Sequence, residues 1–348
     1  MTAKNSLPPL ERLLNLFTEV RQGEATSALL LALNIFLILT AYYILKPVRE
    51  ALILSGSGGA EIKSYVAAGQ TLLLLGAVPL YAWLAGRHDR RSLINRVTVF
   101  FAACLAAFYF LAVAGVPVAI AFYLWVGIFN LMVPAQFWAF ANDLYTPEAG
   151  KRLFVIVAIG ASSGAVFGSF IAAHLIGPVG IYQLLLVSAG VLLASLGLTH
   201  LVDARERRPA VDRPSGSEAD ESLGRNGAFR LVLGNRYLLL IALLMLFLNW
   251  VNTTGEYILG RTVKEAAAAL LAADPSVAPD EETFIGHFYA DFFTVVNIAG
   301  LLLQLFVVSR VLKYLGVRAA IFILPLIALG GFLVAAFYPL LGMVRWVK

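Results

Sequence analysis

Charged residues and cysteine are both scarce in this sequence. Only 14% of its 348 residues are charged, whereas an average soluble domain has about 25%. The single cysteine, Cys104, lies in an apolar run, so no disulfide can form within the chain. The sequence has no G-x-x-x-x-G-K-[ST] phosphate loop, no H-E-x-x-H motif and only four dispersed histidines. We therefore expect no enzyme, no metal site and no cofactor.

Apolar residues are present in excess. They make up 60% of the chain, and the mean hydropathy is +0.83. A water-soluble protein with this much apolar surface would aggregate, which excludes a cytosolic protein and a nucleic-acid-binding protein. The net charge of +5 and the pI near 9.3 instead fit a membrane protein whose loops carry lysine and arginine. We expect an all-α polytopic membrane protein whose main partner is the lipid bilayer.

Nine stretches are apolar enough to cross a bilayer, whose core requires about 20 residues of helix. The predicted spans are residues 26–46, 64–85, 97–116, 117–141, 152–174, 179–201, 237–259, 284–309 and 318–340. A turn at Gly115-Val116-Pro117 separates the third from the fourth. The first stretch is too long and begins too late for a cleaved signal peptide, so we expect it to be a true span.

Basic residues are distributed unevenly among the loops. With the N-terminus in the cytoplasm, the loops after spans 2, 4, 6 and 8 hold sixteen lysines and arginines, and the loops after spans 3 and 5 hold none. Lysine and arginine are enriched on the cytoplasmic side of a membrane. We therefore expect a cytoplasmic N-terminus, and we expect the membrane to be a bacterial inner (plasma) membrane.

One polar segment, residues 202–236, divides the chain. It contains six acidic residues and seven arginines and has too few apolar residues to form a core. This pattern predicts a cytoplasmic N-terminal segment at 1–25, a six-span half at 26–201, a cytoplasmic linker at 202–236 and an incomplete half of three spans at 237–348.

The two parts share an internal repeat. Residues 43–51 read YILKPVREA and residues 257–266 read YILGRTVKEA, and one inserted residue aligns them. In both parts the next span has an Ala-Gly pair, then a glycine and a basic loop. Two parallel halves of six spans are the pattern of major facilitator transporters, so we expect about nine spans of a twelve-span, major-facilitator-like bundle. A genuine nine-span protein is the alternative.

Four residues at the end of the first span are candidates for a site. Tyr43, Lys46, Arg49 and Glu50 share one helix face. Pro47 lacks a backbone N–H, so we expect the helix to be disrupted there. Two cations on one face suit a polyanionic substrate, with Tyr43 as a further contact and Glu50 as a gating residue. The alternative is that both cations only reach out to the membrane interface.

The repeat places a second group of candidates in span 7. Tyr257, Arg261 and Lys264 correspond to the aromatic and basic residues of the first span. Glu256 follows Asn252, Thr253, Thr254 and Gly255, so this part of the span is polar on several sides. We expect Glu256, Arg261 and Lys264 to contact substrate, with Glu256 pairing with one of the cations or taking up a proton. A purely structural ion pair is the alternative.

A third group lies where spans 4 and 5 meet. Thr146-Pro147-Glu148 is typical of a helix start. The surrounding polar residues are candidates for a cytoplasmic gate, namely Asn142, Asp143, Lys151 and Arg152. Trp138 either stacks on a nucleotide base or belongs to the interfacial aromatic belt. An ordinary solvated loop is the alternative for the charged residues.

Three glycines in span 5, Gly160, Gly164 and Gly168, are spaced four residues apart. This small-xxx-small pattern allows another helix to approach closely. We expect a tight helix–helix contact along this face.

Together these motifs resemble the ATP/ADP translocases of plastids and obligate intracellular bacteria, a family of nucleotide exchange transporters distinct from the mitochondrial carriers. The resemblance rests on YYILKPVREALIL and GAEI within residues 42–62, on FWAFAND and EAGKRLF within residues 137–154, and on GEYILG in span 7. It implies a twelve-span, major-facilitator-like fold and exchange of nucleotides driven by their own gradients.

The resemblance also implies roles for individual residues. Arg49 and Glu256 match family positions tied to transport, and Lys46 matches a position that is commonly basic. The sequence departs from the family pattern before Leu124-Trp125, where Tyr123 stands in place of an acidic residue. This departure bears directly on the exchange of ATP for ADP.

These observations lead to three functional hypotheses. The first is an antiporter that exchanges nucleotides of the ATP/ADP type or similar phosphorylated anions. The second is a major facilitator carrier of another solute, coupled to protons through Glu256. The third is a membrane module that anchors or senses without transport, a hypothesis that rests on the incomplete second half and on Tyr123.

Overall fold

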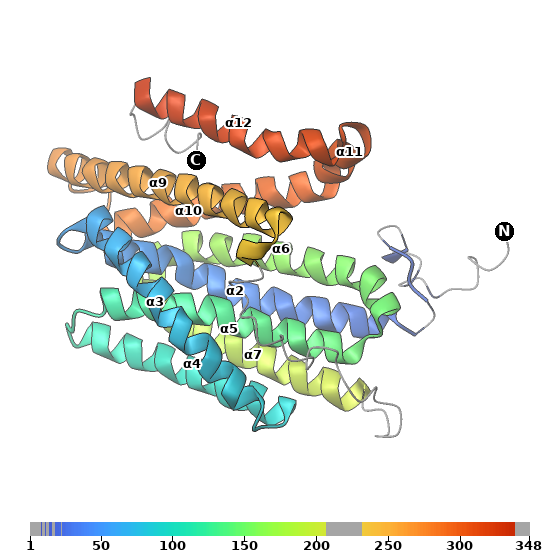
Figure 1. Cartoon of the computed structure of the whole chain (residues 1–348). Helices are drawn as coiled ribbons and strands as arrows, with labels where there is room; N and C mark the ends of the chain where they lie inside the picture. Colours follow the sequence, from blue (N-terminus) through green and yellow to red (C-terminus); the bar gives the residue numbers. More distant parts are fainter. Residues whose placement is uncertain are drawn as a thin grey trace. The chain divides into compact units, whose positions relative to one another are not determined.

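The computed structural model describes residues 23–206 and 232–337, together with residues 8, 11, 14, 15 and 18–21. Every regular element in this part of the chain is helical (Figure 1). The helices are α2 (Ala25–Ser55), α3 (Gly59–Ala85), α4 (Arg90–Val113), α5 (Ala119–Leu144), α6 (Pro147–Val179), α7 (Gln183–Glu206), α9 (Arg236–Ala273), α10 (Glu281–Leu302), α11 (Val308–Tyr314) and α12 (Gly316–Phe337). Most of the predicted linker 202–236 lies outside the described residues.

Eight of the described helices, α2 to α7, α9 and α10, are long and apolar enough to cross a membrane. They coincide with the first eight predicted spans, which confirms an all-helical, polytopic, integral membrane protein. The ninth predicted span corresponds to α12, in which Ala319–Leu333 forms a shorter apolar helix. The major-facilitator-like arrangement of the spans stays a prediction.

Local signals in the sequence set several helix ends. At the start of α6, Thr146 is the N-cap and accepts a hydrogen bond from the backbone N–H of Ala149, with Pro147 in the first turn. The predicted turn between α4 and α5 is present, and Gly115 adopts a positive φ of 77° there. That backbone region favours glycine, which explains the residue type.

One prediction about the first span is wrong. Pro47 does not end α2, because the helix continues to Ser55, well beyond the predicted end at residue 46. Proline removes the hydrogen bond to the carbonyl of Tyr43, but contacts with neighbouring helices keep the segment helical. Tyr43, Lys46, Arg49 and Glu50 therefore lie within a regular helix.

The chain divides into two compact units. The first comprises Met1–Glu206 and Val263–Tyr314, and the second comprises Arg207–Thr262 and Leu315–Lys348. By contact, α10 therefore groups with the first six spans. The two halves predicted on either side of the linker were inferred from the sequence repeat, and this division stays a prediction.

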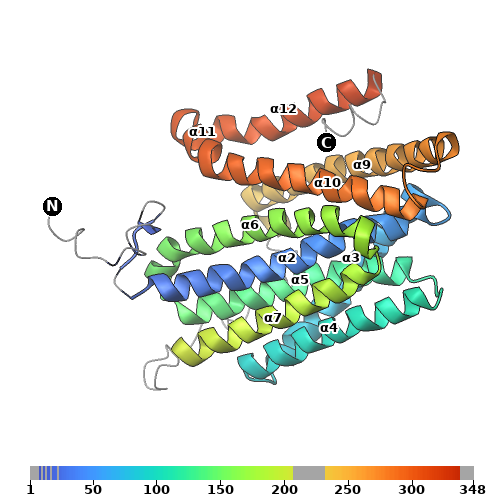
Figure 2. The same ribbon diagram turned by 180° about the vertical axis from the view of Figure 1, so that it is seen from behind.

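Helix α2 is the centre of the first unit. It packs against α6, α7, α10 and α5, and both ribbon views show it between α6 and the pair α5 and α7 (Figures 1 and 2). A side-chain methyl group at Gly160, Gly164 or Gly168 would collide with the backbone of Ala32, Phe36 or Thr40, respectively. The small-residue pattern of span 5 therefore allows the close contact between α6 and α2 that the sequence predicts.

Polar side chains join α10 to α6. The side-chain amide of Asn297 donates to the backbone oxygen of Ala165 at 3.1 Å and to the hydroxyl of Ser169 at 2.9 Å. Ser162 also lies 2.8 Å from the amide oxygen of Gln304, in the π-helical turn Leu303–Val307. These bonds satisfy groups that hydrocarbon would leave without partners.

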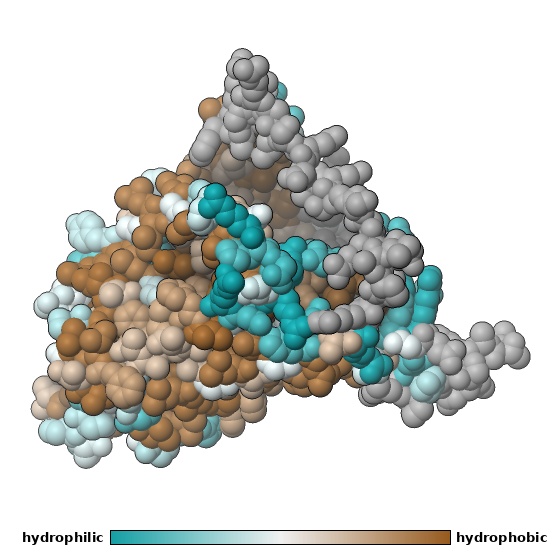
Figure 3. Space-filling model, turned by 90° about the horizontal axis from the view of Figure 1, so that it is seen from below, coloured by the Kyte–Doolittle hydropathy of each residue, from teal (hydrophilic) through white to brown (hydrophobic). Residues whose placement is uncertain are grey.

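The surface of the first unit carries many apolar side chains. On α3, for example, Leu72 and Leu75 are 71% and 67% exposed. Apolar residues cover most of the face seen in Figure 3, and hydrophilic residues gather in limited areas of it. Acyl chains are the natural environment for such a surface.

The second unit, taken by itself, contains residues 236–262 of α9 together with α12. Its apolar side chains are also largely exposed, including Phe247 and Trp250 at 56% and 66%. The side chain of Asn235 accepts a hydrogen bond from the backbone N–H of Tyr237 and so caps the start of α9.

Candidate functional site

The strongest concentration of buried charge lies where α2 ends and α3 begins. The carboxylate of Glu50 is shared by two cations: one oxygen lies 2.5 Å from the guanidinium of Arg49, and the other lies 2.6 Å from the ammonium of Lys63. The side chains of Arg49, Glu50 and Lys63 are only 12%, 2% and 7% exposed. We call these three residues and Lys46 the charge cluster.

Aromatic rings surround the cations of the charge cluster. The ammonium of Lys46 lies 4.0 Å from the ring centre of Phe293 and 5.2 Å from that of Tyr43. The guanidinium of Arg49 lies 4.6 Å from the ring centre of Tyr123, within the range of a cation–π contact. On α10, the ring of Tyr289 lies 6.0 Å from the ammonium of Lys63. The ring faces thus stabilise positive charge without adding negative charge.

In the charge cluster, Arg49 and Lys63 are both paired with the carboxylate of Glu50. Burying ions is costly unless they are paired, and removing one partner of a buried pair costs about 3–5 kcal/mol. Here two cations depend on the same carboxylate. A group that replaced Glu50 would have to bring at least as much negative charge.

Several predicted residues of the first span are thus brought together. Tyr43, Lys46, Arg49 and Glu50 lie in one region, as their spacing on a single helix face predicts. The ion pair with the buried Glu50 holds the guanidinium of Arg49 inside the protein.

Lys264 lies at the C-terminal end of α2, and its role in substrate contact stays a prediction. Its ammonium donates to the backbone oxygen of Gly56 at 2.6 Å, at the C-terminal end of α2. This end of a helix carries carbonyls without intrahelical partners and a partial negative charge. Lys264 therefore caps the C-terminal end of α2, the helix that carries Lys46, Arg49 and Glu50.

The remaining span 7 candidates lie in the second unit. Glu256 accepts a hydrogen bond from the side-chain amide of Asn252 at 3.3 Å. Tyr257 is half-buried and Arg261 is exposed. The roles of Glu256 and Arg261 in substrate contact stay predictions.

Trp138 lies at the other end of the first unit. Its ring packs edge-on against Phe154, 5.6 Å between centres. The neighbouring Leu153 belongs to a core cluster that includes Ala28. Ala28 precedes Lys46 by eighteen residues of helix, or about 27 Å along the axis. The structure therefore does not bring Trp138 to the charge cluster.

The predicted gating residues of the α5–α6 junction fall into two groups. Asp143 forms an ion pair with Arg90 of α4 at 2.8 Å, which links the ends of two spans. Asn142 and Lys151 are exposed. A further ion pair, between Arg91 and Asp203, links α4 to α7 at 3.5 Å.

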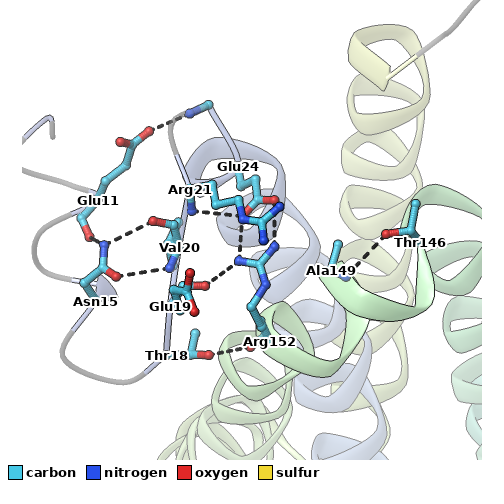
Figure 4. A network of polar contacts seen from close by, with 11 residues as sticks. Glu11, Asn15, Thr18, Glu19, Val20, Arg21, Glu24, Thr146, Ala149 and Arg152 are labelled. Atoms are coloured by element: carbon cyan, nitrogen blue, oxygen red, sulfur yellow. Dashed lines mark hydrogen bonds and ion pairs between the residues drawn. The ribbon is translucent and has the colours of Figure 1, made fainter. Parts of the chain in front are cut away.

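Arg152 fixes the start of α6 to the segment before α2. Its guanidinium bonds both carboxylate oxygens of Glu24 at 3.0 Å and also the backbone oxygen of Glu19, while Thr18 donates to the carbonyl of Arg152 (Figure 4). The hydrogen bond from Arg152 is the main cause that lowers the pKa of Glu24, outside the spans. These contacts join the start of α6 to the segment before α2, and the gating role of Arg152 stays a prediction.

Sequence reasoning missed three residues of the site. Lys63 lies just before the predicted span 64–85, and Tyr289 and Phe293 lie within the predicted span 284–309; none of the three was a candidate for the site. All three reach the site through contacts between helices far apart in sequence. No periodic pattern signals such contacts; the one local signal is that Lys63 directly follows the GAEI motif.

The fold and site together define a class of protein. Eight apolar helices make it an integral membrane protein, and the buried cations have no neighbouring cluster of metal-ligating side chains within the described residues. Buried charged residues in an integral membrane protein are typical of pathways for substrates or ions.

The comparison with known families found a match over part of the chain. Residues 4–119 match the family described as TLC ATP/ADP transporter. Over this third of its length the chain is similar to the ATP/ADP transporters that its motifs also resemble. The matched segment contains all four residues of the charge cluster. No curated protein and no solved structure matched the chain.

Proposed function

We propose that this chain exchanges nucleotides across the membrane and binds their phosphates at the charge cluster. The observation that carries the proposal is the sharing of one buried carboxylate by two cations, with a third cation one helical turn away. Hydrogen bonds between ionised groups are roughly twice as strong as neutral ones, so an incoming phosphate competes effectively for these cations.

In this mechanism Lys46 and Arg49 are phosphate ligands and Glu50 is the exchangeable counter-ion. Without substrate, Glu50 neutralises Arg49. A bound nucleotide takes over that role and releases the carboxylate, which favours rearrangement of the surrounding helices and opening to the other side. The nucleotide that enters from the opposite side completes the exchange.

The other predicted residues take secondary roles in the proposal. Glu256 and Arg261 contribute from span 7, and Lys264 changes partner when the end of α2 moves. The pairs formed by Asp143 and Arg152 close the cytoplasmic side, with the N-terminus in the cytoplasm of a bacterial cell. The basic loops support this orientation.

Substitution of the two ligands tests the site. Arg49→Ala and Lys46→Ala should each reduce nucleotide exchange by tenfold or more, because each removes a charged hydrogen bond of about 1.5–3 kcal/mol. Arg87→Gln is the matched control, since Arg87 stacks on Trp83 beyond the far end of α3. Unchanged exchange by correctly inserted Arg49→Ala protein would contradict the assignment.

A second candidate rests on Tyr123, which stacks on Arg49 at the position where related transporters carry an acid. This candidate is a carrier of another solute, coupled to protons through Glu256. Flux driven by a pH gradient without any nucleotide on the opposite side would favour it over exchange. Nucleotide binding with no flux would instead favour a sensing or anchoring module.

A further inference from the structure

A polar cavity that the proposed mechanism does not use lies inside the first unit. It is enclosed by α2, α4, α5 and α7, and four polar side chains line it, namely Thr98, Gln136, Ser195 and Thr199. Gln136 is only 3% exposed, and among the described residues neither atom of its side-chain amide has a hydrogen-bond partner. We propose that this cavity binds one water molecule, which bonds the amide of Gln136 and bridges α5 to its neighbouring helices.

The size and lining of the cavity fit a single water molecule. Its volume is about 20 Å³, and a buried water needs at least about 10–15 Å³ together with several polar partners. The amide of Gln136 and three hydroxyl groups supply these partners. None of the described lining residues carries a carboxylate, so an ion in the cavity would lack a counter-charge. The chemistry of the lining therefore favours water over a cation.

Two of the hydroxyl groups already use their own protons elsewhere. Ser195 donates to the backbone oxygen of Leu192 at 2.7 Å, and Thr199 donates to the backbone oxygen of Ser195 at 3.1 Å. Their oxygens can still accept a hydrogen bond, because a hydroxyl oxygen has two lone pairs. A water molecule can therefore donate to a hydroxyl group and also bond the amide of Gln136. Of the groups that line the cavity, Gln136 is the one that depends on the water.

Two rows of polar side chains connect the cavity with the partly exposed ends of α4 and α7. On α4, Arg91, Asn95 and Thr98 are spaced four and three residues apart and share one helix face. On α7, Asp203 lies 3.5 Å from Arg91, and Nε2 of His200 lies 2.6 Å from the amide oxygen of Asn95. Apolar side chains in these positions would offer water no hydrogen bonds. The two rows therefore supply a route along which water reaches Gln136.

A single substitution removes the site without exposing the core. One water makes only some of the hydrogen bonds that a glutamine amide can form, so an apolar side chain at position 136 remains the more stable choice. Gln136→Leu therefore removes the main partner of the water and leaves the protein folded. Gln70→Leu is the matched control. Gln70 lies on α3 outside the cavity, and its buried amide oxygen likewise has no partner among the described residues.

X-ray hydroxyl-radical footprinting of the purified chain detects the water. Radicals form from bound as well as bulk water and oxidise the aromatic rings that they contact, and mass spectrometry then locates the oxidised residues. Phe137 and Phe140 line the cavity, whereas Phe122 and Phe129 are also buried but lie in a cluster of aromatic rings. In the wild type, the two rings that line the cavity should be oxidised several-fold faster than the other two.

The two variants complete the test, with thermal unfolding as the check that each is folded. Gln136→Leu should lower the oxidation of Phe137 and Phe140 about tenfold, the equivalent of one hydrogen bond to the water, and Gln70→Leu should leave it unchanged. An unchanged rate in Gln136→Leu, or an equal fall in Gln70→Leu, would contradict a water held by Gln136. Equal oxidation of all four rings in the wild type would overturn the proposal without reference to any variant.

Discussion

Replacing Gly164 with alanine should loosen the contact on which the charge cluster depends. The added methyl group would collide with the backbone of Phe36 on α2, including its carbonyl oxygen. Backbone atoms cannot rotate away as a flexible side chain does, so α2 and α6 must separate. Forcing extra atoms into a packed contact costs about 1–3 kcal/mol.

Gly190→Ala is the matched control for this prediction. Gly190 also lies inside a helix, α7, but a methyl group there would meet no atom within 4 Å. Alanine is favoured over glycine in a helix by about 1 kcal/mol. The same chemical change should therefore destabilise the protein at position 164 and stabilise it slightly at position 190.

Thermal unfolding in detergent measures the difference. One kcal/mol corresponds to about 2–4 °C in Tm for a protein of 150–250 residues. Taking about 2 kcal/mol for the collision, we expect Gly164→Ala to lower Tm by roughly 4–8 °C and Gly190→Ala to raise it by a few degrees. Equal Tm values for the two variants would refute the assigned contact between α6 and α2.

Three further predictions follow from other contacts. Tyr123→Ala should weaken exchange several-fold and Tyr123→Phe should not, because the ring rather than the hydroxyl stacks on Arg49; uptake assays compare them. The Glu24–Arg152 pair should stabilise the protein above the ordinary carboxyl pKa of about 4.5 and cease to do so as the pH falls through the lowered pKa of Glu24. The Tm difference between wild type and Glu24→Gln should accordingly vanish in acid. Gln136→Leu should raise Tm by a few degrees, since both amide atoms of Gln136 are buried without a partner in the described structure; a lower Tm would contradict this.

The spans and some of their ends could be predicted because their signals are local, whereas the predicted ends at residues 46 and 259 fall short of Ser55 and Ala273. Apolar runs of sufficient length, the turn at Gly115 and the cap at Thr146 each depend on neighbouring residues only. The shared face of Lys46 and Arg49 also follows from helix periodicity alone. The continuation of α2 past Pro47 to Ser55 could not be predicted, because contacts with other helices decide whether a proline ends a helix.

Of the residues that form the site, only those on α2 could be predicted from the sequence. The α2 residues were found from their spacing, whereas Lys63 and the rings of Tyr289 and Phe293 join them through contacts between helices. Trp138 shares a polar motif with the predicted gating residues, yet it packs on Phe154, whose neighbour Leu153 lies in one core cluster with Ala28, about 27 Å along α2 from Lys46. Sequence proximity to a charged motif is a poor guide to position along a membrane-spanning helix.

Counter-exchange in liposomes tests the central claim most directly. The purified chain is reconstituted into liposomes loaded with ADP or left empty, and uptake of labelled ATP is measured in both. We predict uptake that requires internal ADP and is lost in Arg49→Ala. Correctly inserted protein that takes up no ATP in either case, or takes it up equally with and without internal ADP, would contradict nucleotide exchange.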